Sequence, residues 1–412
     1  MKDILNCCMG LDIHRDTIVA CLLVGDPDHE PRTETRTFGT LIPEMANLCA
    51  WVTESDCHYV AMESTGVYWQ PIYERLECCF NGNIHLSVVN ARHMKNVPGK
   101  KTDIRDSEWI ATLLRAGLLK GSFIPDKPFR ELRQLTRYRK NITRDVTSQK
   151  NRIDKFLHTA GFRLSMFLSD IFGASGRAII RHLSQHGTIS MSDLDRCLKT
   201  KTRNKINDIM VSVNGTLSVH ERQCLAMMLS HLELIEMHKC EIEKAIEAEI
   251  MQHTRAMELL CSIPGINVTA ASAILAEIGT DMSRFPTAEH LCSWAGLAPG
   301  NNESAGKRKR ANVNKGNPFL KSMLCEIGWV VTSHRGMYLS GWYWRVKQRI
   351  GAKRAIVALA RKLLVLIYTL FKTDQPYNED RFEQRKLASQ QKRACRMIGE
   401  LVKLGYRVER PA

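Results

Sequence analysis

The chain has 412 residues, which is too long for one ordinary hydrophobic core, so two or three domains are expected. Apolar residues make up 44% and charged residues 25%, as is normal for a globular protein rather than a disordered or fibrous one. The 59 Lys and Arg outnumber the 43 Asp and Glu, for a net charge of +16. This excess favours a polyanionic partner, most simply DNA or RNA, and the alternative is a merely basic surface.

The fourteen cysteines include no C-x-x-C pair, which argues against a zinc ribbon or a thioredoxin-like motif. Many of them lie in apolar runs, as buried reduced thiols do, so a reducing cytoplasm is the expected location. The first residues do not resemble a signal peptide. The apolar run from Leu363 to Phe371 is too short to span a bilayer, so no membrane partner is expected.

The first 120 residues alternate between patterns typical of strands and of helices. Strands are predicted at 7–14, 17–24, 33–38, 59–62 and 84–89, and helices at 42–52, 68–78 and 103–119. Thr102 is the expected N-cap of the last helix. Three antiparallel strands followed by strand–helix–strand crossovers are the order of a ribonuclease H-like α/β fold.

Four carboxylates occupy related positions in this predicted domain. Asp12 lies in the first strand and Glu63 ends the fourth, which should be its neighbour in the sheet. Asp103 and Asp106 begin the last helix and share one face of it. Oxygen ligands of this kind suit Mg²⁺ or Mn²⁺, and a pair of such ions can assist phosphodiester cleavage. The alternative is that the two helical acids only favour a helix N-terminus electrostatically.

The middle of the chain is predicted to contain two long helices, Phe129 to Leu157 and Ser218 to Met251, around an irregular insertion at about 162–216. Residues 128–155 hold nine basic residues against three acids, and Arg137, Lys140 and Arg144 are candidate nucleic-acid contacts. An antiparallel coiled-coil pair or a dimerising arm is one interpretation. Two surface helices of a single domain is the other.

A helix, a tight turn and a second helix are predicted from Leu259 to Ile278. The segment is similar to a helix-hairpin-helix element, in which a helix N-terminus and Gly265 would approach a DNA phosphate. Asn267 stands at the usual second glycine, and Asn tolerates a left-handed backbone. A plain tight turn between helices is the alternative. Farther on, Trp342 to Lys362 carries seven basic residues and no acid, with aromatic residues that suit either stacking on bases or a helix core.

Two short segments are basic and lack an apolar pattern, which suits contact with a phosphate backbone. One is the pair Lys100 and Lys101, directly before the helical acids. The other is the polar loop from Gly300 to Asn317. Its candidate contacts are Lys307, Lys309 and Lys315 with Arg308 and Arg310.

Several short motifs occur in an order that resembles the DEDD transposases of bacterial insertion sequences, of the IS-one-ten type. They are Gly10-Leu11-Asp12, Glu63-Ser64-Thr65-Gly66-Val67-Tyr68, Lys101-Thr102-Asp103-Ile104-Arg105-Asp106, Ile263-Pro264-Gly265-Ile266, Ala295-Gly296-Leu297-Ala298-Pro299, Ser304 and Lys315-Gly316-Asn317. The resemblance covers nearly the whole chain. Where the family usually has Ser-Gly, this chain has Ser304-Ala305-Gly306.

The resemblance implies four segments. They are a RuvC-like catalytic domain (1–125), a coiled-coil linker with its insertion (126–252), a mainly α-helical transposase domain (253–375) and a charged tail (376–412). It implies that Asp12, Glu63, Asp103 and Asp106 are the metal ligands and that Ser304 is a nucleophile that links covalently to DNA.

The same resemblance implies the partners. Family members recombine DNA at the element's ends and at a target, through a Holliday-junction-like intermediate. Some are guided by an RNA from the element's own end. The active site is thought to pair domains of two protomers, so a homodimer or homotetramer is expected.

Three other function classes remain open on the residues alone. A metal-dependent junction resolvase would cut by water attack and would not need Ser304. An actin-like sugar or acetate kinase would share Gly10-Leu11-Asp12 but needs further glycines where His14 and Arg15 stand. A non-catalytic DNA-binding accessory protein would not need Asp12. Bound covalent DNA, ATP binding and the activity of an Asp12→Ala variant discriminate among them.

Overall fold

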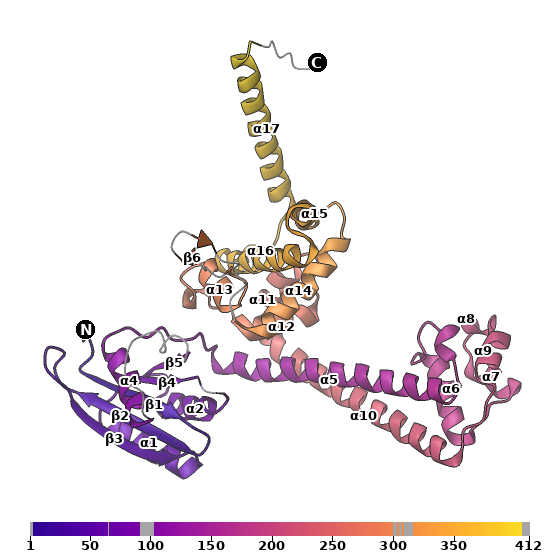
Figure 1. Ribbon diagram of the computed structural model, residues 1–412, viewed down its shortest axis with the longest axis horizontal. Coiled ribbons are helices and arrows are strands. Elements are labelled where there is room, and N and C mark those ends of the chain that lie inside the picture. The colour runs from indigo at the N-terminus through magenta and orange to yellow at the C-terminus, as the bar shows by residue number, and fades with distance from the viewer. Residues whose placement is uncertain are drawn as a thin grey trace. The chain divides into compact units, whose positions relative to one another are not determined.

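The computed structural model describes residues 3–64, 66–90, 103–299, 303–304, 307–308 and 316–405. For residues 103–105, 303–304, 307–308, 381–383 and 385–390 it describes the backbone only. The chain forms two compact units, Met1–Ile124 and Pro125–Ala412 (Figure 1). Lys100, Lys101, Thr102, Lys309, Arg310 and Lys315 lie outside the described residues.

The first unit is built on a five-stranded sheet in the order β3-β2-β1-β4-β5. β1 (Cys7–Ile13), β2 (Thr17–Val24) and β3 (Arg32–Gly39) are antiparallel. β4 (Tyr59–Glu63) and β5 (His85–Val89) run parallel to β1. The helices between and after them are α1 (Ile42–Glu54), α2 (Trp69–Cys79) and α4 (Asp103–Arg115). The predicted order of elements is confirmed.

Alternation along β1 divides the core of this unit into two faces. Met9, Leu11 and Ile13 pack with buried side chains of α1 and α2. Cys8 packs on the other face with Ala111 of α4. α4 ends at Arg115 rather than near residue 119 as expected, because Gly117 takes φ +67° and stops the helix.

In the second unit, α5 (Lys127–Thr159) and α10 (Val219–Ile250) lie side by side (Figure 1). Gln149 donates from Nε2 to the carbonyl oxygen of Met228 at 2.8 Å. α10 begins at a capping box in which Ser218 and Glu221 bond each other's backbone N–H groups. The predicted pair of long helices is therefore confirmed.

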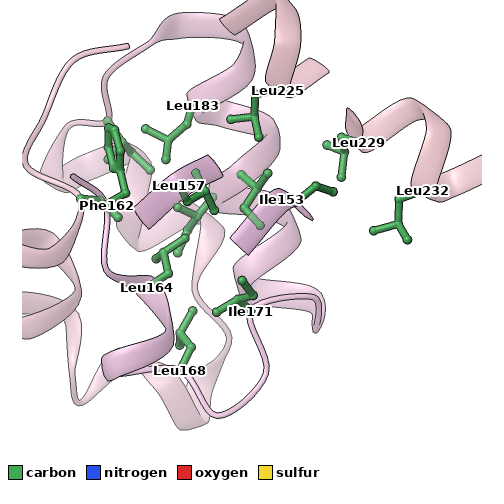
Figure 2. Close-up of a cluster of buried hydrophobic side chains, with 14 of the residues drawn as sticks. Ile153, Leu157, Phe162, Leu164, Leu168, Ile171, Leu183, Leu225, Leu229 and Leu232 are labelled. Atoms are coloured by element: carbon green, nitrogen blue, oxygen red, sulfur yellow. The ribbon is translucent and has the colours of Figure 1, made fainter. Parts of the chain in front are cut away.

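The insertion between these helices contains a short 3₁₀ turn and four helices. They are Leu164–Met166, α6 (Ala174–His186), α7 (Met191–Cys197), α8 (Thr200–Arg203) and α9 (Ile206–Ser212). Their buried apolar side chains pack against both long helices: Figure 2 draws Leu164 and Leu183 of the insertion in one cluster with Leu157 of α5 and Leu225 of α10. The insertion thus adds a hydrophobic core to the end of the helix pair.

The remainder of the second unit is mainly helical. It contains the 3₁₀ turns Met251–His253 and Met282–Arg284 and the helices α11 (Thr254–Cys261), α12 (Val268–Ile278), α13 (Ala288–Trp294), α14 (Pro318–Ser333), α15 (Tyr338–Ile350), α16 (Ala352–Thr373) and α17 (Glu379–Lys403). Among them, α16 contacts α11, α13, α14 and α15. The stretch from 342 to 362 is helical but breaks at Gly351, whose φ is +83°. In the described parts of the chain, no helix is both long and apolar enough to cross a membrane. All fourteen cysteines are free thiols.

Candidate active site and serine loop

Asp12 and Glu63 lie on neighbouring parallel strands. β1 and β4 are paired through Leu11 and Met62, and the next residue along each strand is one of the two acids. Asp12 is 5% exposed, and Glu63 is partly exposed. The carboxyl ends of neighbouring parallel strands form one edge of a sheet, so the two carboxylates share it.

α4 lies unusually close to β1 because Gly10 has no side chain. A Cβ on Gly10 would stand 2.2 Å from the carbonyl oxygen of Ser107 and 2.5 Å from the backbone nitrogen of Ala111. Real Cβ atoms do not approach backbone atoms this closely. Gly10 is therefore needed for the contact between strand and helix, two residues before Asp12.

The direction of α4 brings its first turn to the Asp12 end of the strand. At the other end, Ile4 donates from its backbone nitrogen to the carbonyl oxygen of Arg115 at 2.9 Å. The helix therefore runs antiparallel to β1, and its N-terminus, with Asp103 and Asp106, lies toward Asp12. Asp106 is partly buried, whereas only the backbone of Asp103 is described.

His14 is a neighbour of Asp12 that the sequence interpretation missed. Its Nε2 lies 3.2 Å from Oδ2 of Asp12, and its side chain is 48% exposed. His14 directly follows β1, which ends at Ile13, and it lies two residues after Asp12, a spacing that puts side chains on one face of an extended chain. This alternation is the sequence signal that could have identified it.

The donor chemistry of this edge suits a hard divalent cation, because Asp12, Glu63 and Asp106 all offer carboxylate oxygens. Within the described residues, however, no three Asp, Glu, His or Cys side chains form a ready metal cluster. The side chain of Asp103 lies outside that comparison.

Ser304 lies on a short hairpin in the second unit. β6 (Glu303–Ser304) pairs antiparallel with β7 (Lys307–Arg308), and Ser304 stands opposite Lys307. The register therefore places a basic residue across from the serine. Their side chains lie outside the described residues.

The loop that carries this hairpin, called the serine loop below, runs from Gly296 to Gly316, and its two ends are in contact. A Cβ on Gly316 would stand 2.2 Å from the backbone nitrogen of Gly296. Asn317 donates from its backbone nitrogen to the carbonyl oxygen of Trp294 at 3.2 Å. The absence of a side chain at Gly316 allows the ends of the loop to touch.

Asn317 also connects the loop to a buried acid, Glu277 of α12. Its Nδ2 donates to Oε2 of Glu277 at 2.5 Å, and its Oδ1 caps α14 by accepting from the N–H groups of residues 319 and 320. Glu277 is 3% exposed and is neutralised by Arg137 and Arg133 of α5. Burial lowers the pKa of Arg133 to about 10, although the charge of Glu277 opposes that shift. The end of the serine loop is therefore held by charges that span α5, α12 and α14.

The basic residues predicted to contact nucleic acid on α5 differ in their surroundings. Arg137 binds Glu277, and Lys140 lies 2.6 Å from Oγ of Ser322 and 3.5 Å from Oε1 of Glu326. Arg144 is exposed to solvent. The charges of Arg137 and Lys140 are thus at least partly used to hold α5 against α12 and α14.

The turn between α11 and α12 has the predicted helix–turn–helix form. Gly265 takes φ +88°, and a Cβ there would stand 2.9 Å from Cγ2 of Val331 on α14. The interpretation of Asn267 as a left-handed residue is wrong, since its φ and ψ are −95° and 173°. Asn267 is instead the N-cap of α12 and accepts from the N–H of Ala270, which requires an extended backbone.

Comparison with known proteins finds two family models on this chain. Residues 9–161 match a model described as "Transposase", and residues 257–343 match one described as "Transposase IS116/IS110/IS902 family". The first match contains Asp12, Glu63, Asp103 and Asp106. The second contains the helix–turn–helix and Ser304.

Individual relatives match this chain over only part of their own length. The pilin gene-inverting protein of Moraxella bovis is 32% identical over 124 residues, which are 29% of this chain and 38% of that protein. An insertion element IS110 protein of 43.6 kDa from Streptomyces coelicolor is 27% identical over 227 residues, which are 49% of this chain and 53% of that one. The chain thus matches about two fifths to a half of the length of these relatives.

Proposed function

The chain belongs to the IS116/IS110/IS902 family of transposases, and from that premise we propose that it cleaves and rejoins DNA at the ends of an insertion sequence. The observation that carries the proposal is the shared sheet edge of Asp12 and Glu63, with the first turn of α4 beside it. Carboxylates grouped in this way can bind divalent metal ions that assist phosphodiester cleavage.

Asp12, Glu63, Asp103 and Asp106 would hold Mg²⁺ or Mn²⁺ in this proposal, as ligands of a ribonuclease H-like domain. A bound ion would offset the negative charge that develops at the attacked phosphate. His14 would orient the carboxylate of Asp12 through their 3.2 Å contact. Lys100 and Lys101, which precede Asp103 in the sequence, would contact the phosphate backbone.

Ser304 would be the nucleophile of strand cleavage. Its hydroxyl oxygen forms a bond to phosphorus, one DNA oxygen leaves, the hydroxyl proton is lost and the leaving oxygen gains a proton. Reversal by a new DNA hydroxyl releases the serine and joins the strands, so no external energy source is needed. Lys307, which stands opposite Ser304 in the hairpin register, is suited to offset the phosphate charge during this exchange.

The other partners follow from the family resemblance. A guide RNA encoded by the element is the partner that would select the target DNA. A homodimer or homotetramer would bring the carboxylate edge of one protomer to the serine loop of another. The helix pair α5–α10, with its own hydrophobic core, is a stiff element suited to such an assembly.

The test uses full-length protein, Mg²⁺ and DNA that carries the ends and flanks of the surrounding element. Asp12→Asn should abolish cleavage, whereas Asp16→Asn, at a side chain that is 78% exposed, should not. Ser304→Ala should remove a covalent protein–DNA adduct that Ser293→Ala, an exposed serine of α13, retains. Cleavage by Ser304→Ala without an adduct would mean that water attacks instead. Full recombination by Asp12→Asn would reject the catalytic proposal.

A further inference from the structure

Trp344 of α15 lines an open hollow on the second unit, far along the chain from the carboxylates and the serine. The hollow has a volume of about 340 Å³ and is lined by Arg335, Gly336, Ser340, Gly341 and Trp344. The indole is 39% exposed. The volume is at the small end of the roughly 300–1,000 Å³ of ligand pockets, which suits one flat ring rather than a double helix.

Gly341 creates the space beside the indole. Residues 341 and 344 are three apart and share one face of the helix. No heavy atom outside the helix backbone would lie within 4 Å of a Cβ at Gly341, so packing does not require a glycine there. A glycine inside a helix costs about 0.5–1 kcal/mol relative to alanine. Its effect here is to leave the N-terminal side of the indole uncovered.

Two cations accompany the indole. Nζ of Lys347, one turn after Trp344, lies 4.2 Å from the ring centroid, and Cζ of Arg335 lies 6.0 Å from it. The indole Nε1 donates a hydrogen bond to the carbonyl oxygen of Thr332 at 3.4 Å, which fixes the orientation of the ring. The ring is thus oriented from one edge and flanked by positive charge.

The sequence around this hollow is strongly basic. Residues 327–373 contain nine Lys or Arg and no Asp or Glu. Glu379 of α17, an acid on a helix that contacts α15, accepts from the backbone N–H of Tyr338 and from the hydroxyl of Tyr377 and does not line the hollow. The electrostatic surroundings therefore favour an anionic ligand that also presents a flat apolar ring.

We propose that this hollow binds an unpaired nucleotide of single-stranded DNA, with its base stacked on Trp344 and its flanking phosphates near Arg335 and Lys347. An unpaired base has a free face that can stack on an aromatic ring, whereas a base inside a duplex does not. The choice of DNA rests on the proposed function, because strand cleavage and exchange expose unpaired DNA. The hollow would hold a displaced strand apart from the duplex.

The test measures binding of full-length protein to a short single-stranded DNA that contains one fluorescent 2-aminopurine. Trp344→Ala should weaken binding by about 5- to 150-fold, the range for loss of one base–aromatic stack. Trp344→Phe should keep most of the affinity. Gly341→Leu should reproduce the loss by filling the hollow while Trp344 stays in place. Tyr138→Ala, at an exposed tyrosine of α5, is the matched control and should bind like wild type.

The proposed phosphate contacts of Arg335 and Lys347 are tested separately, by the salt dependence of binding. Lys347→Ala and Arg335→Ala should each lower the slope of log affinity against log salt by about 0.7, the value for one phosphate contact of a single strand. Duplex affinity should change by less than about twofold in all Trp344 and Gly341 variants, because the stack is made only by unpaired bases.

Three outcomes would overturn this inference alone. They are a Trp344→Ala protein that binds single-stranded DNA like wild type, a dependence on Trp344 seen only with RNA of the same sequence, and a wild type that binds duplex but no single strand. The last result would leave the proposed function intact. A wild type that binds neither form of DNA would reject both proposals.

Discussion

Arg137 and Glu277 form a bidentate ion pair between α5 and α12. Nε of Arg137 lies 2.8 Å from Oε1 of Glu277, and its Nη2 lies 2.9 Å from Oε2. The same carboxylate accepts from Asn317 at the end of the serine loop, and Arg133 lies 3.2 Å from it. One buried acid thus joins two arginines of a long helix to the loop that carries Ser304.

Glu277→Gln should lower the free energy of unfolding of the second unit. Removing one charge from a buried pair typically costs about 3–5 kcal/mol, because the partner charge stays buried without compensation. Here Arg133, which is largely buried, would be left in that position. Urea unfolding followed by tryptophan fluorescence measures the loss. Glu326→Gln, at a side chain that is 61% exposed, is the control and should cost about 1 kcal/mol or less. An equal cost for both variants would contradict this account of Glu277.

Gly10→Ala should disturb the carboxylate edge without changing any charged residue. The new Cβ would stand 2.2 Å from a backbone oxygen of α4, so the helix must move away from β1. Overpacking of this kind costs about 1–3 kcal/mol. Cleavage should fall with stability, because the first turn of α4 would be displaced from Asp12. Thermal unfolding and DNA cleavage are the two measurements.

The matched control is Gly121→Ala in the same unit. Its Cβ would be 3.6 Å from the nearest atom, which is ordinary contact, and its φ needs no glycine. This variant should keep the stability and activity of wild type. A Gly10→Ala protein that melts and cleaves like Gly121→Ala would show that the close approach is not needed.

The sheet and its acidic edge were predictable because local pattern and topology agree there. Buried runs and alternation identify the strands, and the order of elements makes the first and fourth strands neighbours. Asp12 and Glu63 then fall on one edge without knowledge of any side-chain contact. Ser218 was predictable as the start of a long helix, since Glu221 completes a capping box.

Glu277 and its partners could not be predicted in the same way. Glu277 lies in an otherwise apolar helix, and Arg137 is 140 residues away from it along the chain. An arginine that pairs with a distant buried acid looks, in one sequence, like an arginine free to bind DNA. The prediction of a left-handed backbone at Asn267 was wrong for a related reason. Asn is favoured both at N-caps and at left-handed positions, so the residue type does not distinguish the two. Only the tertiary contacts separate these alternatives.

Divalent metal should stabilise the first unit through Asp12. A ligand that binds only the folded state adds RT ln(1 + [L]/Kd), which is about 1.4 kcal/mol when its concentration is ten times Kd. Mg²⁺ or Mn²⁺ should therefore raise the thermal midpoint of wild type in the absence of DNA. Asp12→Asn should lose this shift and Asp16→Asn should keep it. An unchanged shift in Asp12→Asn would place the ion elsewhere.

Glu236 should make the helical core of the α5–α10 pair sensitive to acid. Its Oε1 lies 2.6 Å from Nη2 of Arg177 and 3.5 Å from Nζ of Lys150. Burial alone would raise the pKa of Glu236, but the hydrogen bond and charge of Arg177, with Lys150, outweigh it and hold this pKa below 4.5. A depressed folded-state pKa adds stability above pH 4.5 and loses it as pH falls through the folded value.

Glu236→Gln should therefore cost about 1 kcal/mol at pH 7 and almost nothing once the pH lies well below 4.5. The urea midpoints of wild type and variant, measured at both pH values, give the two differences. Glu233→Gln is the control, since Glu233 also pairs with an arginine of α6 but both side chains are more exposed. Its cost at neutral pH should be smaller, because water screens an exposed pair. A difference between wild type and Glu236→Gln that persists undiminished in acid would mean that the carboxylate charge is not what stabilises this core.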